Sequence, residues 1–169
     1  METTWGAPTP NRTEVNMSLN ARYGAVAGAL AAVLAIAPAW SAEPVVTVYK
    51  TPNCGCCVKW IEHLREAGLT VEAKNAGNLD AVRRQLGVPA RLAGCHTATV
   101  GGYVVEGHVP ASQVLKLLKE KPAVAGISVP GMPLGSPGME GPGGKPYQVF
   151  SWSQDGKTEA ISLEQPRER

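Results

Sequence analysis

The sequence predicts an α/β domain with a central mixed sheet and flanking helices, extended by a C-terminal Gly/Pro-rich loop and a short hairpin. Runs rich in β-branched residues alternate with apolar residues at helical spacing from residue 44 to residue 121. Two adjacent glycines join two of these runs, as in the tight turn of an antiparallel hairpin. The chain has 169 residues, of which 44% are apolar and 18% charged, so it can bury one core with extra segments around it.

Residues 43–125 are predicted to form the principal domain. The strand 44–50 leads into a Thr-Pro-Asn loop, and apolar residues at helical spacing predict a helix from Cys57 to a stop at Gly68. The remaining predicted elements are a strand at 69–73, a helix capped by Asn78 and ended by Gly87, strands at 97–100 and 103–106 joined by two glycines, and a helix at 110–120. The expected order is β, α, β, α, β, β, α.

Residues 126–169 are predicted to pack on the same domain as a flap, a short hairpin and a tail. The stretch 126–146 is dominated by Gly and Pro and has too few periodic apolar residues for a helix or a long strand. We therefore expect an irregular loop there. The runs 147–152 and 157–163 flank a Ser-Gln-Asp-Gly turn and predict the hairpin.

Residues 1–42 are predicted to hold an N-terminal extension and a secretory signal peptide. Arg22 precedes the apolar run 23–39, and small residues follow it, which is the order of a signal peptide. The run is shorter than the roughly 20 residues that usually span a bilayer, and Pro38 interrupts it. We therefore expect export to the periplasm by a cleavable signal peptide, with no stable membrane span afterwards. The cleavage position and the true start stay open.

The charge pattern excludes one class of partner. The formal net charge is only +2, and Lys and Arg are scattered along the chain. No basic stripe of the kind that follows a phosphate backbone is present in the sequence. We therefore do not expect nucleic acid as a partner.

Three cysteines, Cys54, Cys56 and Cys57, form a CxCC cluster where the first strand, a loop and the first helix meet. The unpaired N–H groups of a helix N-terminus favour the thiolate, which is the form that binds metals and acts as a nucleophile. Soft thiolates select Cu(I), and bridging sulfur lets a few cysteines hold several ions. Imidazole can complete the coordination shell and tolerates Cu(II).

The element order and the CxxC pair Cys54 and Cys57 resemble the thioredoxin superfamily over about residues 45–121. That superfamily faces its dithiol with a cis-proline just before the third strand. Here Cys95 and His96 occupy the corresponding Gly-Cys-His-Thr run. Two residue types that bind metals thus replace a substrate-docking proline, which favours metal binding over disulfide exchange.

A closer resemblance is to the CopG-like family of periplasmic proteins associated with copper resistance, known as a domain of unknown function. The matching motifs are TPNCGCC at 51–57, GCHT at 94–97, GHVP at 107–110 and GMPLGSPGM at 131–139. The resemblance covers nearly all of residues 45–139 and implies a copper-binding, thioredoxin-like protein with a copper–thiolate cluster. Residues 43–125 are accordingly expected to be a thioredoxin-like metal-binding domain. The metal ligands that the resemblance implies are Cys54, Cys56, Cys57 and Cys95, with His96 and His108 as additional ligands. Met132 and Met139 carry thioethers on the Gly/Pro-rich loop and are weaker candidates, because loops on a rigid scaffold often carry binding groups.

Several alternatives stay open. Zinc is a rival metal, because four thiolates suit a tetrahedral site. A thiol-disulfide oxidoreductase could use the Cys54/Cys57 pair, so enzymatic activity, as a copper or a thiol oxidoreductase, is undecided. A purely structural disulfide framework is disfavoured, because such closely spaced cysteines close almost no loop. His63 is predicted to lie on the exposed face of the first helix, outside the site.

These observations together predict a periplasmic protein that holds Cu(I) or Cu(II) in a cysteine-thiolate and histidine site. Its role would be copper resistance by sequestration or by copper redox chemistry, with several copper ions per chain. The expected partners are copper ions and other periplasmic or membrane copper-handling proteins. The number and oxidation state of the ions, and the oligomeric state, stay open.

Overall fold

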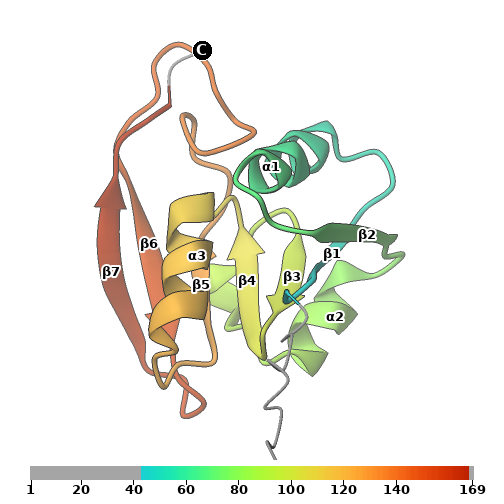
Figure 1. Cartoon of the computed structure of the whole chain (residues 1–169), viewed down its shortest axis with the longest axis vertical. Coiled ribbons are helices and arrows are strands. Elements are labelled where there is room, and N and C mark those ends of the chain that lie inside the picture. The colour runs from blue at the N-terminus through green and yellow to red at the C-terminus, as the bar shows by residue number, and fades with distance from the viewer. Residues whose placement is uncertain (1–42, 168–169) are drawn as a thin grey trace, which may run out of the picture. The chain divides into compact units, whose positions relative to one another are not determined.

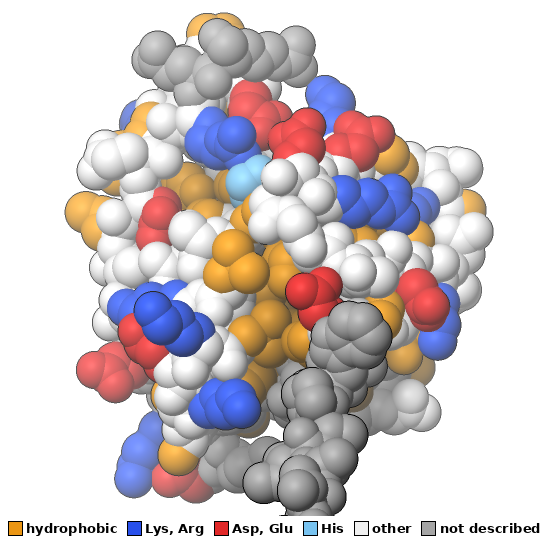
Figure 2. All heavy atoms as spheres, in the orientation of Figure 1, with side chains coloured by type: hydrophobic (Ala, Val, Ile, Leu, Met, Phe, Trp, Pro, Cys, Tyr) orange, Lys and Arg blue, Asp and Glu red, His pale blue; other side chains and the backbone are white. Residues whose placement is uncertain are grey.

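The computed structural model describes residues 43–167, which belong to one compact unit (Figure 1, with all heavy atoms drawn in Figure 2). The predicted signal peptide at 1–42 lies outside the described residues. Among the helices that are described, none has the length and apolar character that a membrane crossing requires.

A seven-stranded mixed sheet forms the centre of the molecule, with the strand order β2-β1-β3-β4-β5-β6-β7 (Figure 1). The strands are β1 (Val46–Lys50), β2 (Val71–Asn75), β3 (Thr97–Val100), β4 (Tyr103–Gly107), β5 (Gly126–Val129), β6 (Tyr147–Trp152) and β7 (Thr158–Glu164). The β1–β2 and β4–β5 pairs are parallel, and the other pairs are antiparallel. The α/β class and the mixed sheet predicted from the sequence are confirmed, and the arrangement is compatible with a thioredoxin-like fold.

Helices cover both faces of the sheet. They are α1 (Gly55–Glu66), α2 (Leu79–Gln85), α3 (Ala111–Glu120) and the short 3-10 helix η1 (Ala90–Leu92). Val104 and Val105 are neighbours on β4 and therefore point to opposite faces. Val105 belongs to the large core that contains Trp60 of α1 and Val114 of α3, whereas Val104 packs in a smaller core with Leu92 of η1. Helices α1 and α3 therefore share one face, and η1 lies on the other.

The first helix begins two residues earlier than predicted, at Gly55. Cys54 is its N-cap, and the Cys54 Sγ accepts a hydrogen bond from the backbone N–H of Cys57 at 3.3 Å. A cysteine sulfur thus caps the helix where Ser or Asp is usual. As a result, Cys56 and Cys57 lie in the first turn of α1.

One segment that was predicted to be irregular contains a strand. Gly126–Val129 form β5, which is buried at all four positions and pairs with β4. A strand of four residues that is buried on both faces shows no alternation of apolar and polar side chains, so the pattern could not reveal it. Only glycine fits at its first position, because a Cβ on Gly126 would overlap the Val104 carbonyl and the Trp152 ring. The predicted C-terminal hairpin is confirmed as β6 and β7.

Candidate metal centre

The CxCC cluster lies at the N-terminus of α1, at the end of the sheet where the C-terminus of β1 lies. Cys54 and Cys57 are joined by a disulfide, and Cys56 is a free thiol. The Cys56 Sγ lies 3.4 Å from the Cys54 Sγ. Cys57 is fully buried, whereas Cys54 and Cys56 are partly exposed. The three sulfur atoms predicted as ligands therefore form one compact group.

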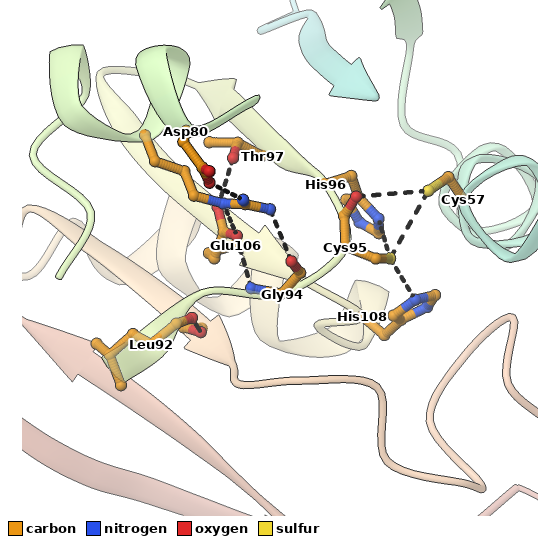
Figure 3. Close-up of polar contacts among 11 residues, drawn as sticks. Cys57, Asp80, Leu92, Gly94, Cys95, His96, Thr97, Glu106 and His108 are labelled. Carbon is orange, nitrogen blue, oxygen red and sulfur yellow. Dashed lines mark hydrogen bonds and ion pairs between the residues drawn. The ribbon is translucent and has the colours of Figure 1, made fainter. Parts of the chain in front are cut away.

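A second segment brings Cys95 and His96 to the same point from the loop between η1 and β3 (Figure 3). The Cys95 Sγ lies 3.6 Å from the Cys57 Sγ and 4.0 Å from the Cys56 Sγ. It also lies 3.2 Å from Nδ1 of His96 and 2.8 Å from Nε2 of His108, which directly follows β4. The Cys95 Sγ is therefore the central atom of the cluster.

Two overlapping groups of donor atoms result. The four cysteine sulfur atoms form one group, and Cys95, His96 and His108 form the other, with all donor atoms of a group within 4.8 Å of one another. Cys95 belongs to both groups. Once the disulfide is reduced, the site can therefore offer an all-sulfur set and a mixed sulfur and nitrogen set that share the Cys95 sulfur, which is a geometry suited to more than one metal ion.

The two histidines are held in the neutral state by burial. Both are fully buried, and burial lowers the pKa of His96 well below its ordinary value and also lowers the pKa of His108. Nδ1 of His108 lies 2.7 Å from the Pro137 carbonyl oxygen. A carbonyl can only accept, so Nδ1 donates, and Nε2 is left with its lone pair directed towards Cys95.

His96 packs its ring against Trp60, with the ring centroids 4.2 Å apart. Its Nε2 is buried and has no hydrogen-bond partner among the described residues. Buried polar atoms without a partner are uncommon in folded proteins, and a site for an ion is one of the recognised reasons. His96 therefore faces the Cys95 sulfur with Nδ1 and keeps its second ring nitrogen, Nε2, without a polar partner among the described residues.

Cys95 is not a ready-made thiolate. Burial, followed by the neighbouring Cys56, raises the pKa of Cys95 to about 12. At neutral pH the metal-free thiol is therefore protonated, and a metal ion that binds Cys95 must displace that proton.

The cluster opens to solvent beside Cys56. A shallow hollow of about 390 Å³ is lined by Gly55, Cys56, Lys59, Leu134, Gly138, Met139 and Glu140. Met139 thus lies next to one thiol of the cluster. The structure does not place Met132 in this hollow, and its side chain is 54% exposed.

The segment 135–138 is fixed against α1 by a close backbone approach. Gly138 has φ of +86°, and a Cβ at this position would lie 2.7 Å from the Cys56 carbonyl oxygen and 2.9 Å from the backbone nitrogen of Trp60. The same Cβ would lie 3.4 Å from Nδ1 of His108. A glycine here therefore lets the loop reach His108 and the first turn of α1 together.

The prediction that His63 is solvent-exposed was wrong. The residue is half-buried, and its Nε2 accepts a hydrogen bond from the backbone N–H of Ala111 at 3.0 Å. Ala111 begins α3, whose N-cap Pro110 offers no side-chain acceptor, so His63 supplies it. His63 also contacts Arg167. It is not part of either donor group, so its exclusion from the site agrees with the geometry.

Sequence reasoning missed two charged residues behind the Cys95–His96 loop, Arg83 and Glu106. Glu106, labelled in Figure 3 beside Gly94 and Thr97, is fully buried, and it pairs with Arg83 at 2.8 Å. The available signal was a carboxylate inside an otherwise apolar strand, Tyr-Val-Val-Glu-Gly. Charged residues are almost never fully buried unless they are paired.

Comparisons with known proteins agree with one another. The family described as "Protein of unknown function, DUF411" matches residues 92–139. A solved structure titled "Copper resistance protein copG- Form 2" is 40% identical with a TM-score of 0.69, and the match covers 72% of this chain and 98% of that one. A second, titled "Copper resistance protein copG- Form 1", is 41% identical with a TM-score of 0.69, covering 73% and 99%. No curated protein sequence matches the chain.

Proposed function

The chain belongs to the family of the copper resistance protein CopG, and from this premise we propose that it is a periplasmic copper-binding protein. Cys54, Cys56, Cys57, Cys95, His96 and His108 would hold the metal. The observation that carries the proposal is the meeting of the two donor groups at Cys95. The proposed role is copper resistance, by sequestration or by cycling between Cu(I) and Cu(II).

The donor set fits copper. Cu(I) prefers thiolate sulfur, and a thiolate can bridge two ions, so a shared Cys95 suits a cluster of several Cu(I) ions. Imidazole nitrogen from His96 and His108 accepts either oxidation state. Nδ1 of His96 and Nε2 of His108 lie 3.2 Å and 2.8 Å from the Cys95 Sγ, which supports a metal inside this group. Met139 lines the hollow beside Cys56, where a thioether could receive an incoming Cu(I) ion.

Copper binding would first require reduction of the Cys54–Cys57 disulfide, because only thiolates are ligands. Zinc remains the rival metal, since four thiolates also suit a tetrahedral zinc site. The two buried histidines beside the sulfur group favour copper, because a closed four-sulfur zinc site would leave them without a role.

The test is anaerobic Cu(I) loading of the reduced mature chain, followed by elemental analysis and competition with a chelator of moderate affinity. We expect several copper ions per chain, and fewer in a Cys95→Ser/His96→Ala double variant. A His63→Ala variant is the matched control, because this histidine lies outside both donor groups. Failure of the reduced wild-type chain to retain Cu(I), or retention of Zn²⁺ in preference to Cu(I), would refute the proposal.

A second candidate function is thiol-disulfide exchange. Its support is the Cys54–Cys57 disulfide at the head of α1. The free thiol of Cys56 has its Sγ 3.4 Å from the Cys54 Sγ, however, so an internal thiol lies beside the disulfide and would compete with an external substrate. Insulin reduction by the metal-free protein, lost on Cys54→Ser, would support this function, and inactivity would count against it.

The export of the chain and its delivery of copper to another protein are also proposals. Signal-peptide cleavage can be tested by N-terminal sequencing of the protein recovered from a periplasmic fraction. A membrane exporter or a soluble periplasmic chaperone would be the acceptor. The hollow beside Cys56 supports this idea, because it is where a partner's ligand could reach the cluster.

A further inference from the structure

A buried carboxylate lies directly behind the loop that carries Cys95 and His96. Glu106 is 0% exposed, and both of its oxygens are engaged. Oε1 accepts a hydrogen bond from the backbone N–H of Gly94 at 2.7 Å, and Oε2 accepts one from the hydroxyl of Thr97 at 2.6 Å. These two anchor points stand immediately before Cys95 and immediately after His96, so one side chain holds both ends of the ligand-bearing segment (Figure 3).

Arg83 of α2 binds both this carboxylate and the backbone of the loop. Its Nε donates to Glu106 Oε1 at 2.8 Å, and a terminal nitrogen donates to the Gly94 carbonyl oxygen at 2.6 Å. The third arm of the guanidinium meets Asp80, which is 77% exposed. The planar fork of Arg83 thus fixes the carboxylate and the loop backbone at once, which a lysine cannot do.

We propose that Arg83 and Glu106 form a buried clamp that positions Cys95 and His96 for the metal. The inference rests on the proposed function and deepens it by adding two positioning residues that touch no metal. Three hydrogen bonds join this ion pair to Gly94 and Thr97, and a fourth joins Arg83 to Glu106. With Gly94 and Thr97 fixed, the two residues between them have little freedom to move.

A role in stability alone explains the clamp poorly. A buried ion pair is often no more stabilising than apolar residues of the same size, because its desolvation offsets its attraction. The polar contacts of Glu106 go to the loop and to Arg83, and not to the core around it. The arrangement is therefore directed at the loop.

The test is a double-mutant cycle on Cu(I) affinity, with Glu106→Gln and Arg83→Lys as separate perturbations. Gln keeps the volume of Glu106 but cannot accept hydrogen bonds at both ends of the loop. We expect each variant to weaken Cu(I) binding by about 10-fold or more, the size usual for residues that orient metal ligands. In the Cys95→Ser/His96→Ala background the same substitutions should change affinity less than about twofold, because the ligands that they position are gone.

Asp80→Ala is the matched control, since it removes only the exposed contact of Arg83. It should leave Cu(I) affinity unchanged. An equal loss of affinity from Glu106→Gln in both backgrounds would show a general structural effect and overturn the clamp. Unchanged affinity for both Glu106→Gln and Arg83→Lys in folded protein would also overturn it.

A measurement without metal separates this inference from the proposed function. In the reduced, metal-free protein, hydrogen exchange at the Gly94 and Cys95 amides should be faster in Glu106→Gln and Arg83→Lys by about 10-fold, while exchange in α3 is unchanged. If the wild-type chain binds no copper but this local acceleration is found, the clamp stands and the proposed function falls. Unchanged exchange at both amides refutes the clamp, whatever the result with copper.

Discussion

Gly138→Ala is the substitution that most directly separates the packing of the C-terminal loop from the composition of the metal centre. Alanine at a φ of +86° costs roughly 1–2 kcal/mol relative to glycine. The new Cβ would also lie 2.7 Å from the Cys56 carbonyl and 2.9 Å from the Trp60 nitrogen, both of them backbone atoms that cannot rotate away. Overpacking of this kind costs a further 1–3 kcal/mol or so. We therefore expect Gly138→Ala to lower the free energy of unfolding by about 2–5 kcal/mol.

The same substitution should weaken Cu(I) binding. Moving the loop away from α1 pulls the Pro137 carbonyl from Nδ1 of His108, the contact of 2.7 Å that orients the ring. Loss of such an orienting contact reduces metal affinity by about 10- to 100-fold.

The assays are urea unfolding of the metal-free protein and chelator competition for Cu(I). Gly143→Ala is the matched control, because Gly143 has φ of +82° in the same segment but nothing within 4 Å of an added Cβ. It should cost about 1–2 kcal/mol and leave Cu(I) affinity unchanged. Equal unfolding free energies and equal Cu(I) affinities for the two variants would refute the reasoning.

Three further predictions concern the loop that faces α1. Cu(I) affinity of the reduced protein should rise between pH 6 and 8, with about a tenfold gain per pH unit from Cys95, because its pKa of about 12 keeps the thiol protonated until the metal binds. Cys95→Ser should remove this tenfold dependence on pH, and an unchanged dependence in the variant would contradict the prediction. Gly94→Ala places a Cβ 2.5 Å from the Gly107 Cα and should lower the free energy of unfolding by about 1–3 kcal/mol in urea, whereas Gly77→Ala, with open space around it, should have an effect below about 1 kcal/mol. In metal-free protein the pKa of His96 is lowered, so below about pH 6.5 this histidine takes up a proton only in the unfolded chain, and the free energy of unfolding should fall by up to about 1.4 kcal/mol per pH unit. Calorimetry of His96→Gln should show a flatter decline of stability with falling pH, and a decline equal to that of the wild-type chain would count against the burial argument.

Local patterns carried most of the fold. The helix α1 follows from apolar residues at helical spacing, and its buried face is the predicted one, with Trp60, Ile61 and Leu64 inward. Both hairpins follow from their turns, and Gly101 and Gly102 have the positive φ values that such a turn requires. These features depend on neighbours in the sequence, which is why they can be read without the structure.

Features that depend on distant partners could not be read in this way. β5 exists because it pairs with β4 and β6, and its own four residues carry no period. His63 was placed outside by its helix face, but the unmet N–H of Ala111 draws it into the interface with α3. Arg83 and Glu106 are 23 residues apart, and no local spacing connects them.

The convergence of the metal ligands follows from the strand order. Thr97 of β3 pairs with Tyr49 of β1 on one side and with Glu106 of β4 on the other, so these three residues form one row across the sheet. Both pairings are antiparallel, so the end of β1, the start of β3 and the end of β4 all lie at one end of the strands, which forms one edge of the sheet. The CxCC cluster follows β1, the Cys95–His96 pair precedes β3, and His108 follows β4. The strand β5 is parallel to β4, so the chain leaving it also reaches this edge, where the Pro137 carbonyl holds His108. Four segments that are separate in the sequence are thus brought together by one sheet topology, and most of the donor atoms can meet only in the folded chain.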